Sequence, residues 1–515
     1  MSSKQTYILA IDQGTTGTTC ALISGKDFSF IGKRTVEFPQ HFPTPGEVEH
    51  NLDEIWESVR KAATLLLKKM EVKSNQITAI GITNQRETIA AIHKQSGKAL
   101  GPAIVWQDRR TTNYCNQLIS EGKDKLIKEK TGLTTDPYFS GTKIKWLLEN
   151  RPEVKRALQE NNALFGTIDA FLLYRLTSGE VFATDITNAS RYLLMNIKSG
   201  EWDNELLSLF GIDPKTLPEI KDTFSSFGKT KGLDFLPDGI PITCLFGDQQ
   251  SALFGQQGIE KGDIKCTYGT GAFMLMNTGS DLIYSNSGLL TTVAYRHQGK
   301  TAYALEGSSY IAGAAIQWMR DQLKVITTSA EIEVLAKSAS SNEEMEHLLF
   351  LPFFSGIGSP YWFSHAKGAI LGITRDTTRT HLARACLEGV ALSVNDLMHA
   401  FAHDLKYPIS AISVDGGASI NNLLMEMQAS ISKTPITRPQ VIETTAYGAA
   451  LGAAIGIGAL NFSDIKGYWK EDRTFRPSSN RELMSYYERK ISMWKESIER
   501  LFLKKSLSTP AHSNS

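Results

Sequence analysis

A pattern of a buried strand, a turn rich in glycine and threonine, and a returning strand occurs twice in this chain. Near the N-terminus, the apolar run of residues 7–11 leads into such a turn and returns as residues 18–23. In the second half, residues 263–268 do the same and return as residues 272–276. Both segments have the apolar runs and turn residues of a β-hairpin. Their likeness suggests a weak internal duplication, although two unrelated Gly-rich hairpins would look equally alike.

Strands alternate with helices along the rest of the chain, which predicts an α/β fold. Residues 51–69 read as a helix, because apolar side chains recur at helical spacing and Asn51 stands where an N-cap is expected. Residues 76–83 and 411–414 read as strands, and we expect a helix over residues 422–432 after the second of them.

The length of 515 residues exceeds what one hydrophobic core usually supports, so we expect two large domains. The predicted boundary lies between residues 255 and 256, which gives an N-terminal domain of residues 1–255 and a C-terminal domain of residues 256–505. Residues 506–515 read as a polar tail.

Composition argues against several functional classes. Basic and acidic residues balance to a net charge of +1, so no bulk field attracts nucleic acid or an anionic membrane. The weakly polar stretch of residues 446–460 is too short to cross a bilayer, so we expect a buried helix there and no membrane insertion. Five scattered cysteines without a Cys-x-x-Cys pair favour a reducing, cytoplasmic location and no zinc cluster.

The standard phosphate-binding motifs are missing from the sequence, which has no Walker A loop and no Gly-x-Gly-x-x-Gly. Other Gly-rich turns can offer backbone N–H groups to phosphate oxygens. The turns concerned are Gly-Thr-Thr-Gly at 14–17, Gly-Thr-Gly at 269–271 and Gly-Gly-Ala at 416–418. Each turn alone is more typical of a tight hairpin, but each directly follows an apolar run. We expect two of them, one per domain, to hold a triphosphate in an interdomain cleft.

Two aspartates stand at the polar ends of apolar strands. Asp248 could accept the proton of a substrate hydroxyl while a phosphoryl group is transferred. Asp12 could hold Mg²⁺ through water. From the residues alone, either carboxylate could equally cap a following turn or helix.

Arg86 and Glu87 follow a strand in the same way, and they could donate to and accept from adjacent hydroxyls of a polyol. An ordinary ion pair is the alternative. Trp106, Tyr138 and Phe273 could wall the carbon side of a small polyol and keep water from the transferred phosphoryl group. Each of these aromatic residues alone is more typical of a plain hydrophobic core.

Six stretches carry a family resemblance. They are Asp-Gln-Gly-Thr-Thr at 12–16, Gly-Ile-Thr-Asn-Gln-Arg-Glu-Thr at 81–88, Ile-Val-Trp-Gln-Asp-Arg-Arg at 104–110, Asp-Pro-Tyr-Phe-Ser-Gly-Thr-Lys at 136–143, Gly-Asp-Gln-Gln at 247–250 and Thr-Tyr-Gly-Thr-Gly at 267–271. Over residues 6–500 the chain resembles the FGGY carbohydrate kinases of the actin/hexokinase-type ATPase superfamily, and the second and fourth stretches most resemble those that act on glycerol. The resemblance implies two ribonuclease-H-like domains flanking an interdomain cleft.

The resemblance also implies an activity, the ATP-dependent phosphorylation of glycerol to sn-glycerol 3-phosphate with ADP as coproduct and Mg²⁺ as cofactor. Asp248 would be the catalytic base and, with Asp12, would hold Mg²⁺ through water. The implied polyol contacts are Arg86, Glu87, Trp106, Tyr138, Asp248, Gln249 and Phe273. The implied nucleotide contacts are Thr15, Thr16, Gly17, Thr270, Gly313, Gln317, Gly416, Gly417 and Asn421.

Two departures from the family pattern carry expectations. Thr19 stands where bacterial relatives often have an arginine, so phosphate neutralisation would depend more on Mg²⁺ and backbone donors. Residues 229–238 hold no arginine where some bacterial relatives bind fructose 1,6-bisphosphate, so we predict that inhibition by this sugar is absent.

Two rival functions stay open. A kinase of xylulose or gluconate would share the phosphate hairpins, but a pocket walled by aromatic residues leaves little room for five carbons. A non-catalytic, actin-like ATP-binding protein would need neither Asp248 nor the pair Arg86 and Glu87. The sequence does not fix the oligomeric state, for which a homodimer or homotetramer is an open alternative.

Overall fold

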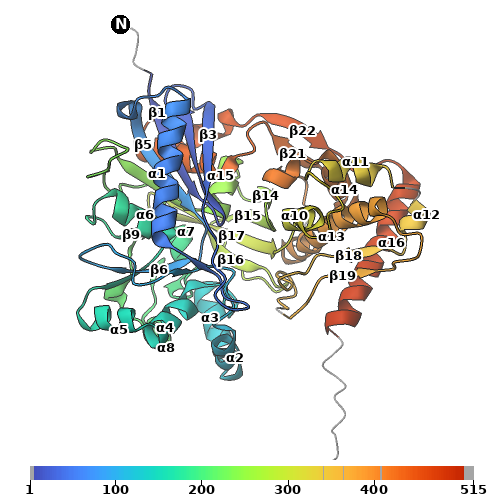
Figure 1. The fold of residues 1–515 in the computed structure, drawn as a ribbon, viewed down its shortest axis with the longest axis horizontal. Helices are drawn as coiled ribbons and strands as arrows, with labels where there is room; N and C mark the ends of the chain where they lie inside the picture. The colour runs from blue at the N-terminus through green and yellow to red at the C-terminus, as the bar shows by residue number, and fades with distance from the viewer. Residues whose placement is uncertain (1–4, 340–341, 364, 406–408, 504–515) are drawn as a thin grey trace, which may run out of the picture.

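The chain folds into two lobes, each built around a mixed β-sheet (Figure 1). The computed structural model describes residues 5–339, 342–363, 365–405 and 409–503, so the polar tail predicted over residues 506–515 lies outside the described residues. We call the lobe around the N-terminal sheet the first lobe and the other the second lobe.

The sheet of the first lobe has the strand order β13-β5-β1-β2-β3. β1 and β2 form the antiparallel hairpin that the sequence predicts, and β5 and β13 lie parallel to β1. The C-terminal ends of β1, β5 and β13 therefore meet at one edge of the sheet, which is where parallel sheets usually bind ligands. The strands are β1 (Tyr7–Gln13), β2 (Gly17–Ser24), β3 (Phe30–Glu37), β5 (Ile77–Asn84) and β13 (Ile242–Gly247).

The sheet of the second lobe has the order β16-β17-β15-β14-β20-β21-β22. Its five strands β17-β15-β14-β20-β21 repeat the order and the strand directions of β3-β2-β1-β5-β13. The two predicted hairpins thus occupy equivalent places in two sheets of the same topology. The strands are β14 (Ile264–Tyr268), β15 (Ala272–Gly279), β16 (Leu290–His297), β17 (Lys300–Ser309), β20 (Ile412–Asp415), β21 (Ile436–Pro439) and β22 (Glu471–Phe475).

Helix α1 (Leu52–Lys69) covers the face of the first sheet at β2 and β3. The side chain of Asn51 caps the helix by accepting a hydrogen bond from the backbone N–H of Asp53 at 2.9 Å, as the sequence predicts. The apolar side chains at helical spacing are buried against the sheet. They are Ile55, Val59, Ala62, Ala63, Leu66 and Leu67.

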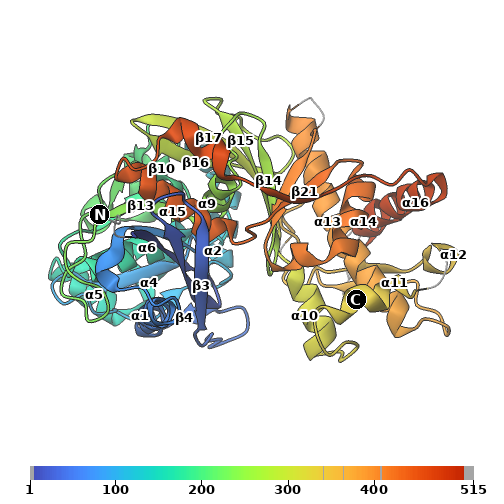
Figure 2. The same cartoon turned by 90° about the horizontal axis from the view of Figure 1, so that it is seen from above.

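Two helices, α9 (Asp248–Gly255) and α15 (Thr444–Gly456), pack against each other, and α9 also contacts β14 and β15 of the second lobe. A side chain on Gly448 would overlap the carbonyl oxygen of Ser251, and one on Gly255 would overlap that of Thr444, so the two backbones touch. Although α15 is late in the sequence, it packs on β1, β5 and β13 and lies in the first lobe (Figure 2). The buried helix predicted over residues 446–460 is therefore present, and it ties the C-terminal half to the first lobe.

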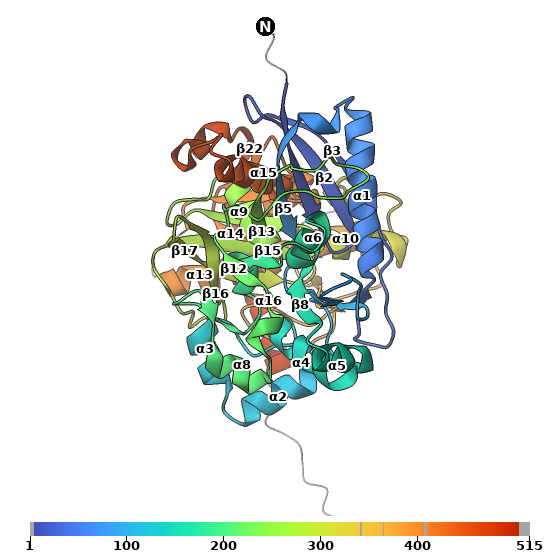
Figure 3. The ribbon, with the colours of Figure 1, turned by 90° about the vertical axis from the view of Figure 1, so that its left-hand side faces the viewer.

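Among the other elements of the first lobe, helices α2, α3, α4, α5 and α8 are gathered below the first sheet (Figure 3). This part of the lobe also has a small sheet of order β4-β7-β6-β8. The elements are β4 (Glu49–His50), η1 (Ser74–Gln76), β6 (Ile89–His93), β7 (Ala103–Ile104), α2 (Thr112–Ser120), α3 (Asp124–Thr131), α4 (Ser140–Asn150), α5 (Pro152–Gln159), β8 (Ala163–Thr167), α6 (Ile168–Leu176), β9 (Ala183–Asp185), α7 (Ile186–Ala189), β10 (Met195–Asn196), β11 (Glu201–Trp202), α8 (Asn204–Phe210), η2 (Pro214–Thr216) and β12 (Glu219–Lys221).

The second lobe is organised around the long, buried helix α13 (Arg379–Leu405), which packs against α11, α14 and β17. Helix α14 covers residues 422–432 as predicted. Among the described helices, none combines the length and apolar character needed to span a membrane. The remaining elements are α10 (Gly313–Asp321), α11 (Glu331–Lys337), α12 (Asn342–Met345), β18 (Leu349–Leu351), β19 (Ala369–Leu371), η3 (Gly417–Ile420), α14 (Asn422–Ser432), η4 (Phe462–Tyr468), α16 (Arg481–Ile498) and the π-helical turn η5 (Glu499–Leu503).

Candidate active site

Three strand ends of the first sheet bring the predicted base, metal and polyol residues together. Asp12 lies near the end of β1, the pair Arg86 and Glu87 follows β5, and Asp248 directly follows β13. Because these strands are parallel neighbours, their ends share one edge. Hydrogen bonds from Arg86 to Glu306 of β17 show that this edge faces the second lobe.

Asp248 is the first residue of α9, and its side chain is 27% exposed. One carboxylate oxygen, Oδ1, accepts a hydrogen bond from the backbone N–H of Gln249 at 2.7 Å and lies 3.2 Å from Nε of Arg86. Burial raises the pKa of Asp248, while the charges of Arg86 and Lys265 oppose the rise. The N-cap of α9 is Gly247, so Asp248 is not the cap residue of this helix. Its partly exposed carboxylate remains available for the proposed role as a base.

Asp12 has the electrostatic environment of a cation ligand. Burial raises its pKa well above the ordinary value, and the negative charge of Asp248 raises it further. A divalent cation would relieve this repulsion. Mg²⁺ typically uses one or two carboxylates together with water and substrate phosphates, which fits this pair. In the part of the chain that the structure describes, no cluster of three or more His, Cys, Asp or Glu side chains forms a metal site from protein alone.

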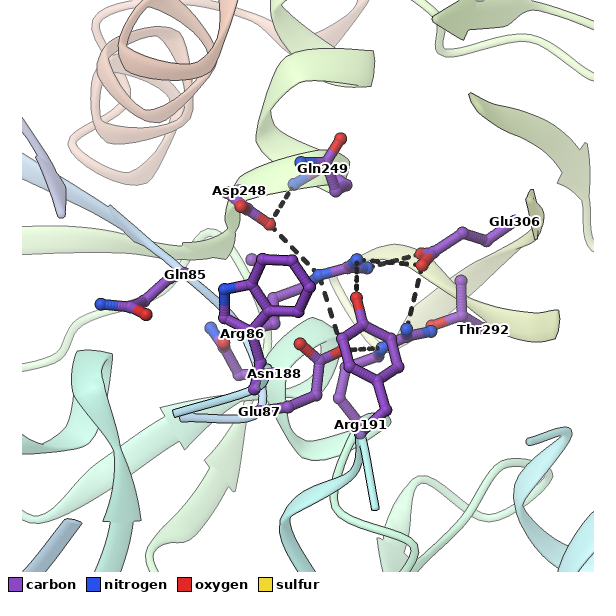
Figure 4. A network of polar contacts seen from close by, with 12 residues as sticks. Gln85, Arg86, Glu87, Asn188, Arg191, Asp248, Gln249, Thr292 and Glu306 are labelled. Atoms are coloured by element: carbon purple, nitrogen blue, oxygen red, sulfur yellow. Dashed lines mark hydrogen bonds and ion pairs between the residues drawn. The ribbon is translucent and has the colours of Figure 1, made fainter. Parts of the chain in front are cut away.

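Arg86 is fully buried at the centre of a polar network (Figure 4). Its Nη1 and Nη2 donate to the two carboxylate oxygens of Glu306 at 2.6 and 2.9 Å. Nη1 also donates to Gln250 at 3.1 Å, and Nη2 donates to the hydroxyl of Tyr138 at 3.4 Å. Within the described residues, Nε makes no hydrogen bond with acceptable geometry, and it is the atom nearest Asp248.

Glu87 is held from both its side chain and its backbone. Its Oε1 accepts a hydrogen bond from Nε of Arg191 at 2.5 Å. Its backbone has a φ of +59°, a left-handed conformation that is uncommon for a residue with a side chain. The carbonyl oxygen accepts from Nζ of Lys143 at 3.2 Å and from the hydroxyl of Ser140 at 3.0 Å, which holds this conformation in place.

The three predicted aromatic residues form one wall across the cleft. The ring of Trp106 makes edge contacts with Tyr138 at a centroid distance of 5.6 Å and with Phe273 at 6.1 Å. Phe273 belongs to β15, so the wall contains side chains from both lobes. Nε1 of Trp106 donates to the hydroxyl of Thr15 at 2.9 Å, which links the wall to the first Gly/Thr turn.

The two Gly/Thr turns are tight and similar. In the first, the backbone N–H of Gly14 donates to the carbonyl of Gly17, and in the second, Gly269 donates to Gly271, both at 2.9 Å. Thr16 is exposed at the tip of the first turn. Thr19, which departs from the family pattern, shares a hydrogen bond with the hydroxyl of Thr35 at 2.8 Å on the neighbouring strand.

A pocket of about 550 Å³ opens beside the second turn and is lined only by residues of the second lobe. Its size is in the range of small-molecule and cofactor sites. Among the predicted nucleotide residues, the pocket is lined by Thr270, Gly313, Gln317, Gly417 and Asn421.

Two of the predicted nucleotide residues, Gly416 and Asn421, also have structural roles beside the pocket. Gly416 has a φ of +84°, and a side chain there would overlap the backbone of Tyr268. Oδ1 of Asn421 caps α14 by accepting from the backbone N–H of Leu424 at 2.9 Å, which leaves its amide nitrogen for the pocket. The predicted nucleotide residues of the first lobe (Thr15, Thr16 and Gly17) lie outside this pocket, across the cleft.

Sequence reasoning missed four buried charged residues at this site, which are Lys143, Arg191, Lys265 and Glu306. Nζ of Lys265 donates to Oε1 of Gln249 at 2.6 Å and to the hydroxyl of Thr267 at 2.7 Å, and it thereby connects the two lobes beside Asp248. Lys143 lies within a stretch that carries the family resemblance. One feature of the sequence could have identified Glu306. It is a single carboxylate within the apolar run of β17, which indicates a buried charge with a partner.

Comparison with protein families matches the two halves of the chain in turn. Residues 7–255 match the N-terminal domain of the FGGY family of carbohydrate kinases, and residues 264–457 match the C-terminal domain of the same family. The predicted fold class, with two lobes of this superfamily around a cleft, is confirmed.

Similar proteins agree with this match. A glycerol kinase from Myxococcus xanthus is 45% identical over 96% of this chain and 99% of its own, and one from Mycoplasma capricolum is 45% identical over 98% and 99%. The crystal structure of Plasmodium falciparum glycerol kinase with ADP superposes with a TM-score of 0.85 at 34% identity, over 96% of this chain and 98% of that one. A gluconate kinase from Lactobacillus acidophilus, 22% identical with a TM-score of 0.83 over 97% of this chain and 98% of its own, shares the fold. The chain belongs to the FGGY family of carbohydrate kinases.

Proposed function

We propose that this chain transfers the γ-phosphoryl group of ATP to glycerol, giving sn-glycerol 3-phosphate and ADP. The observation that carries the proposal is the meeting of Asp248, Arg86 and Glu87 at one sheet edge, beside an aromatic wall made by both lobes. The relatives at 45% identity are glycerol kinases, and the similar Plasmodium falciparum enzyme was solved with ADP. These names support glycerol and an adenine nucleotide as the substrates here.

In the proposed reaction, Asp248 accepts the proton of the attacked hydroxyl. The hydroxyl oxygen forms a bond to the γ-phosphorus while the bond from that phosphorus to the β–γ bridging oxygen breaks, so ADP leaves. The raised pKa of Asp248 suits a group that must take up a proton. Its exposure to the cleft gives the hydroxyl access to the carboxylate.

The polyol is held by groups with fixed directions. Arg86 offers donors and Glu87 an acceptor to adjacent hydroxyls, and Gln249 offers the amide nitrogen that Lys265 leaves free. Trp106, Tyr138 and Phe273 cover the carbon atoms and exclude water, which would otherwise compete for the phosphoryl group.

The nucleotide bridges the two lobes in this proposal. Its adenosine part occupies the second-lobe pocket, near Gln317 and Asn421, and its phosphates reach the turns at Thr15–Gly17 and Thr270. Asp12 and Asp248 would hold Mg²⁺, and the ion would neutralise negative charge on the phosphates. No arginine follows the first turn to share this role.

The proposal is tested by measuring ADP release with the purified chain in a coupled assay. Glycerol, dihydroxyacetone and the pentulose xylulose are compared at saturating Mg-ATP. We expect kcat/KM to be highest for glycerol, by at least about tenfold over xylulose, because unpaired buried polar groups penalise a poor fit strongly. A higher value for xylulose would favour a sugar kinase, and no ADP release with any of the three substrates would favour a non-catalytic nucleotide-binding protein.

We further propose that the chain acts in the cytoplasm, alone or as a homodimer or homotetramer, without nucleic acid as a partner. All five cysteines are buried and unpaired, which suits a reducing compartment. Insensitivity to fructose 1,6-bisphosphate stays a prediction, which the same assay tests when that sugar is added.

A further inference from the structure

The carboxylate of Glu306 stands behind the polyol residues and is completely buried. It comes from β17 of the second lobe, whereas its partners Arg86 and Arg191 come from the first lobe. Its Oε1 accepts from Nη2 of both arginines at 2.9 Å each, and its Oε2 accepts from Nη1 of Arg86 at 2.6 Å. Figure 4 shows both guanidinium groups converging on this one side chain.

This contact determines which atoms of Arg86 can serve a substrate. A guanidinium group has a rigid fork, so two parallel bonds to one carboxylate fix its plane and its direction. With both terminal nitrogens bound to Glu306, the Nε edge is turned toward Asp248, at 3.2 Å. Nε is also the arginine atom that lacks a hydrogen-bond acceptor among the described residues. The unsatisfied donor therefore lies beside the proposed base.

The same carboxylate reaches Glu87 through Arg191. Arg191 donates from Nη2 to Glu306 and from Nε to Oε1 of Glu87, at 2.9 and 2.5 Å. Figure 4 shows the second carboxylate oxygen of Glu87 turned away from Arg191. Glu306 thus anchors both the donor and the acceptor that face the polyol hydroxyls, although it lies behind them.

We infer that Glu306 is the positioning residue of the polyol site, which orients Arg86 directly and Glu87 through Arg191 from the opposite lobe. The inference rests on the proposed phosphorylation of glycerol. It identifies Glu306 as the residue that orients the groups recognising the glycerol hydroxyls. Removing the negative charge would leave two buried arginines with too little compensation, and Arg86 would then turn toward Asp248 or Glu87. The polyol would then lose correctly oriented hydrogen-bonding partners. The adenosine pocket would keep its lining residues in place, because Glu306 is not one of them.

The first variant is Glu306→Gln, which keeps the shape of the side chain and removes its charge. Glu388→Gln is the matched control, because Glu388 is also buried in the second lobe and paired with Arg384 at 3.0 Å and Lys490 at 3.4 Å, away from the site. Both variants lose one buried carboxylate and should lose stability to a similar degree. Only the first is expected to change how the site recognises hydroxyls.

We expect Glu306→Gln to raise the KM for glycerol about 10- to 100-fold, the usual worth of a charged hydrogen bond, and to leave the Kd for ADP within about twofold. Glu388→Gln should leave both constants within about twofold and lower only the melting temperature. If Glu306→Gln does not fold, Glu306→Asp and Arg191→Lys replace it, since both keep the charge and disturb the fork geometry, and the same split between glycerol and ADP is expected.

The outcomes separate the inference from the function on which it rests. If the unmodified chain does not phosphorylate glycerol, the proposed function is wrong. An active chain whose Glu306 variants keep the KM for glycerol, or change the affinities for glycerol and ADP equally, would overturn the positioning role. Loss of glycerol affinity in the Glu388 control to the same extent would also overturn it, because any buried charge would then have the same effect.

Discussion

Asp248 lies between two cations that come from different lobes, Arg86 from the first and Lys265 from the second. Burial raises the pKa of this carboxyl group, and the two cations limit the rise. A general base needs a basic carboxylate that is nevertheless ionised at the working pH, and opposing influences of this kind provide both properties. The protonation state of the proposed base is therefore set by residues that do not themselves accept the proton.

Replacing Asp248 with Asn should lower kcat by at least about 100-fold, because the amide cannot take up the hydroxyl proton. Binding of ADP in the absence of Mg²⁺ should be nearly unchanged, since the proposed adenosine pocket is lined only by the second lobe. The measurements are kcat in the coupled assay and Kd for ADP by calorimetry. Asp281→Asn, at an exposed carboxylate paired with Lys261, is the control and should turn over normally. Unchanged turnover in the Asp248 variant would remove this residue from the mechanism.

Asp396, in α13 of the second lobe, gives a prediction about pH and stability. Its Oδ2 accepts from Nε1 of Trp494 at 2.7 Å and from the hydroxyl of Tyr361 at 3.3 Å. Burial raises the pKa of Asp396 to about 6, although these two donors and the charge of Lys495 oppose the rise. Because the folded pKa is the higher one, the unfolded chain releases this proton first, and folding stability falls as the pH rises from about 4 to 6.

Asp396→Asn should abolish the loss of folding stability with rising pH, because the amide is neutral at every pH. The amide oxygen can still accept the hydrogen bond from Trp494. The shift of about two pKa units corresponds to roughly 3 kcal/mol. The melting temperature of the variant relative to the unmodified chain should therefore rise between pH 4.5 and pH 7. Asp234→Asn, at an exposed side chain, should show no such trend. A constant difference for the Asp396 variant across this range would contradict the raised pKa.

At the scale of elements, the contact between α9 and α15 depends on glycine. Gly255 and Gly448 allow the two helix backbones to touch, and Gly81 lets α15 approach β5 in the same way, next to the carbonyl oxygen of Ala449. Since α9 begins with Asp248, the position of the proposed base depends on how closely α15 packs behind it. Close helix packing at these glycines is therefore part of the geometry of the site.

Gly448→Ala should force α9 and α15 apart, because the added methyl group would overlap the carbonyl of Ser251. Overpacking of this kind costs roughly 1–3 kcal/mol, so we expect a lower melting temperature together with reduced kcat. Gly467→Ala is the control, since a side chain there meets no atom within 4 Å. Equal melting temperatures for the two variants would show that the helices can separate at little cost.

Elements that depend on local pattern could be predicted from the sequence. The hairpins β1–β2 and β14–β15, the capped helix α1 and the helix α14 follow from short apolar runs, turn residues and one N-cap. The strand ends at Asp12, Arg86 and Asp248 could be proposed as one site because each follows an apolar run. These three residues lie close together only because β1, β5 and β13 pair in parallel. The alternation of strands and helices in the sequence suggests such pairing but does not determine it.

Features that depend on distant partners could not be predicted. Glu306 pairs with Arg86 across 220 positions of the sequence. The residues around either one do not indicate which partner it has. Helix α15 was predicted as a buried helix, but its packing on the first sheet follows from complementary glycine surfaces on separate elements. The predicted boundary at residue 255 divides the chain in sequence, whereas α15 crosses back to the first lobe in space.

At the scale of the whole molecule, the two proposed substrate sites are connected to the lobes differently. The polyol residues are tied across the cleft by buried ion pairs to Glu306 and by the contact between Trp106 and Phe273. The adenosine pocket is lined by the second lobe alone, while the turn at Thr15 and the carboxylate of Asp12 belong to the first. In the proposed complex, the triphosphate is therefore the part of the substrates that would contact both lobes where no protein contact already joins them.

This difference predicts which ligand closes the cleft. Relative motion of the lobes should pivot near α9, α15 and the Glu306 network, because these buried contacts leave little freedom there. Adenosine alone would contact one lobe and so would give no interaction that favours a closed form. Glycerol would bind where the lobes are already linked, so it should not bring them closer together either. A non-hydrolysable ATP analogue with Mg²⁺ would contact both lobes through its phosphates and so stabilise the closed state.

Small-angle scattering of the chain with each ligand tests this prediction. We expect the radius of gyration to be unchanged by adenosine or glycerol alone and to decrease with the ATP analogue and glycerol together. Asp12→Asn should weaken the decrease, because the first lobe then loses a ligand for the phosphate-bound cation. Compaction by adenosine alone would place the driving contacts in the second-lobe pocket, and identical scattering in every state would mean that phosphoryl transfer proceeds in a cleft that is already closed.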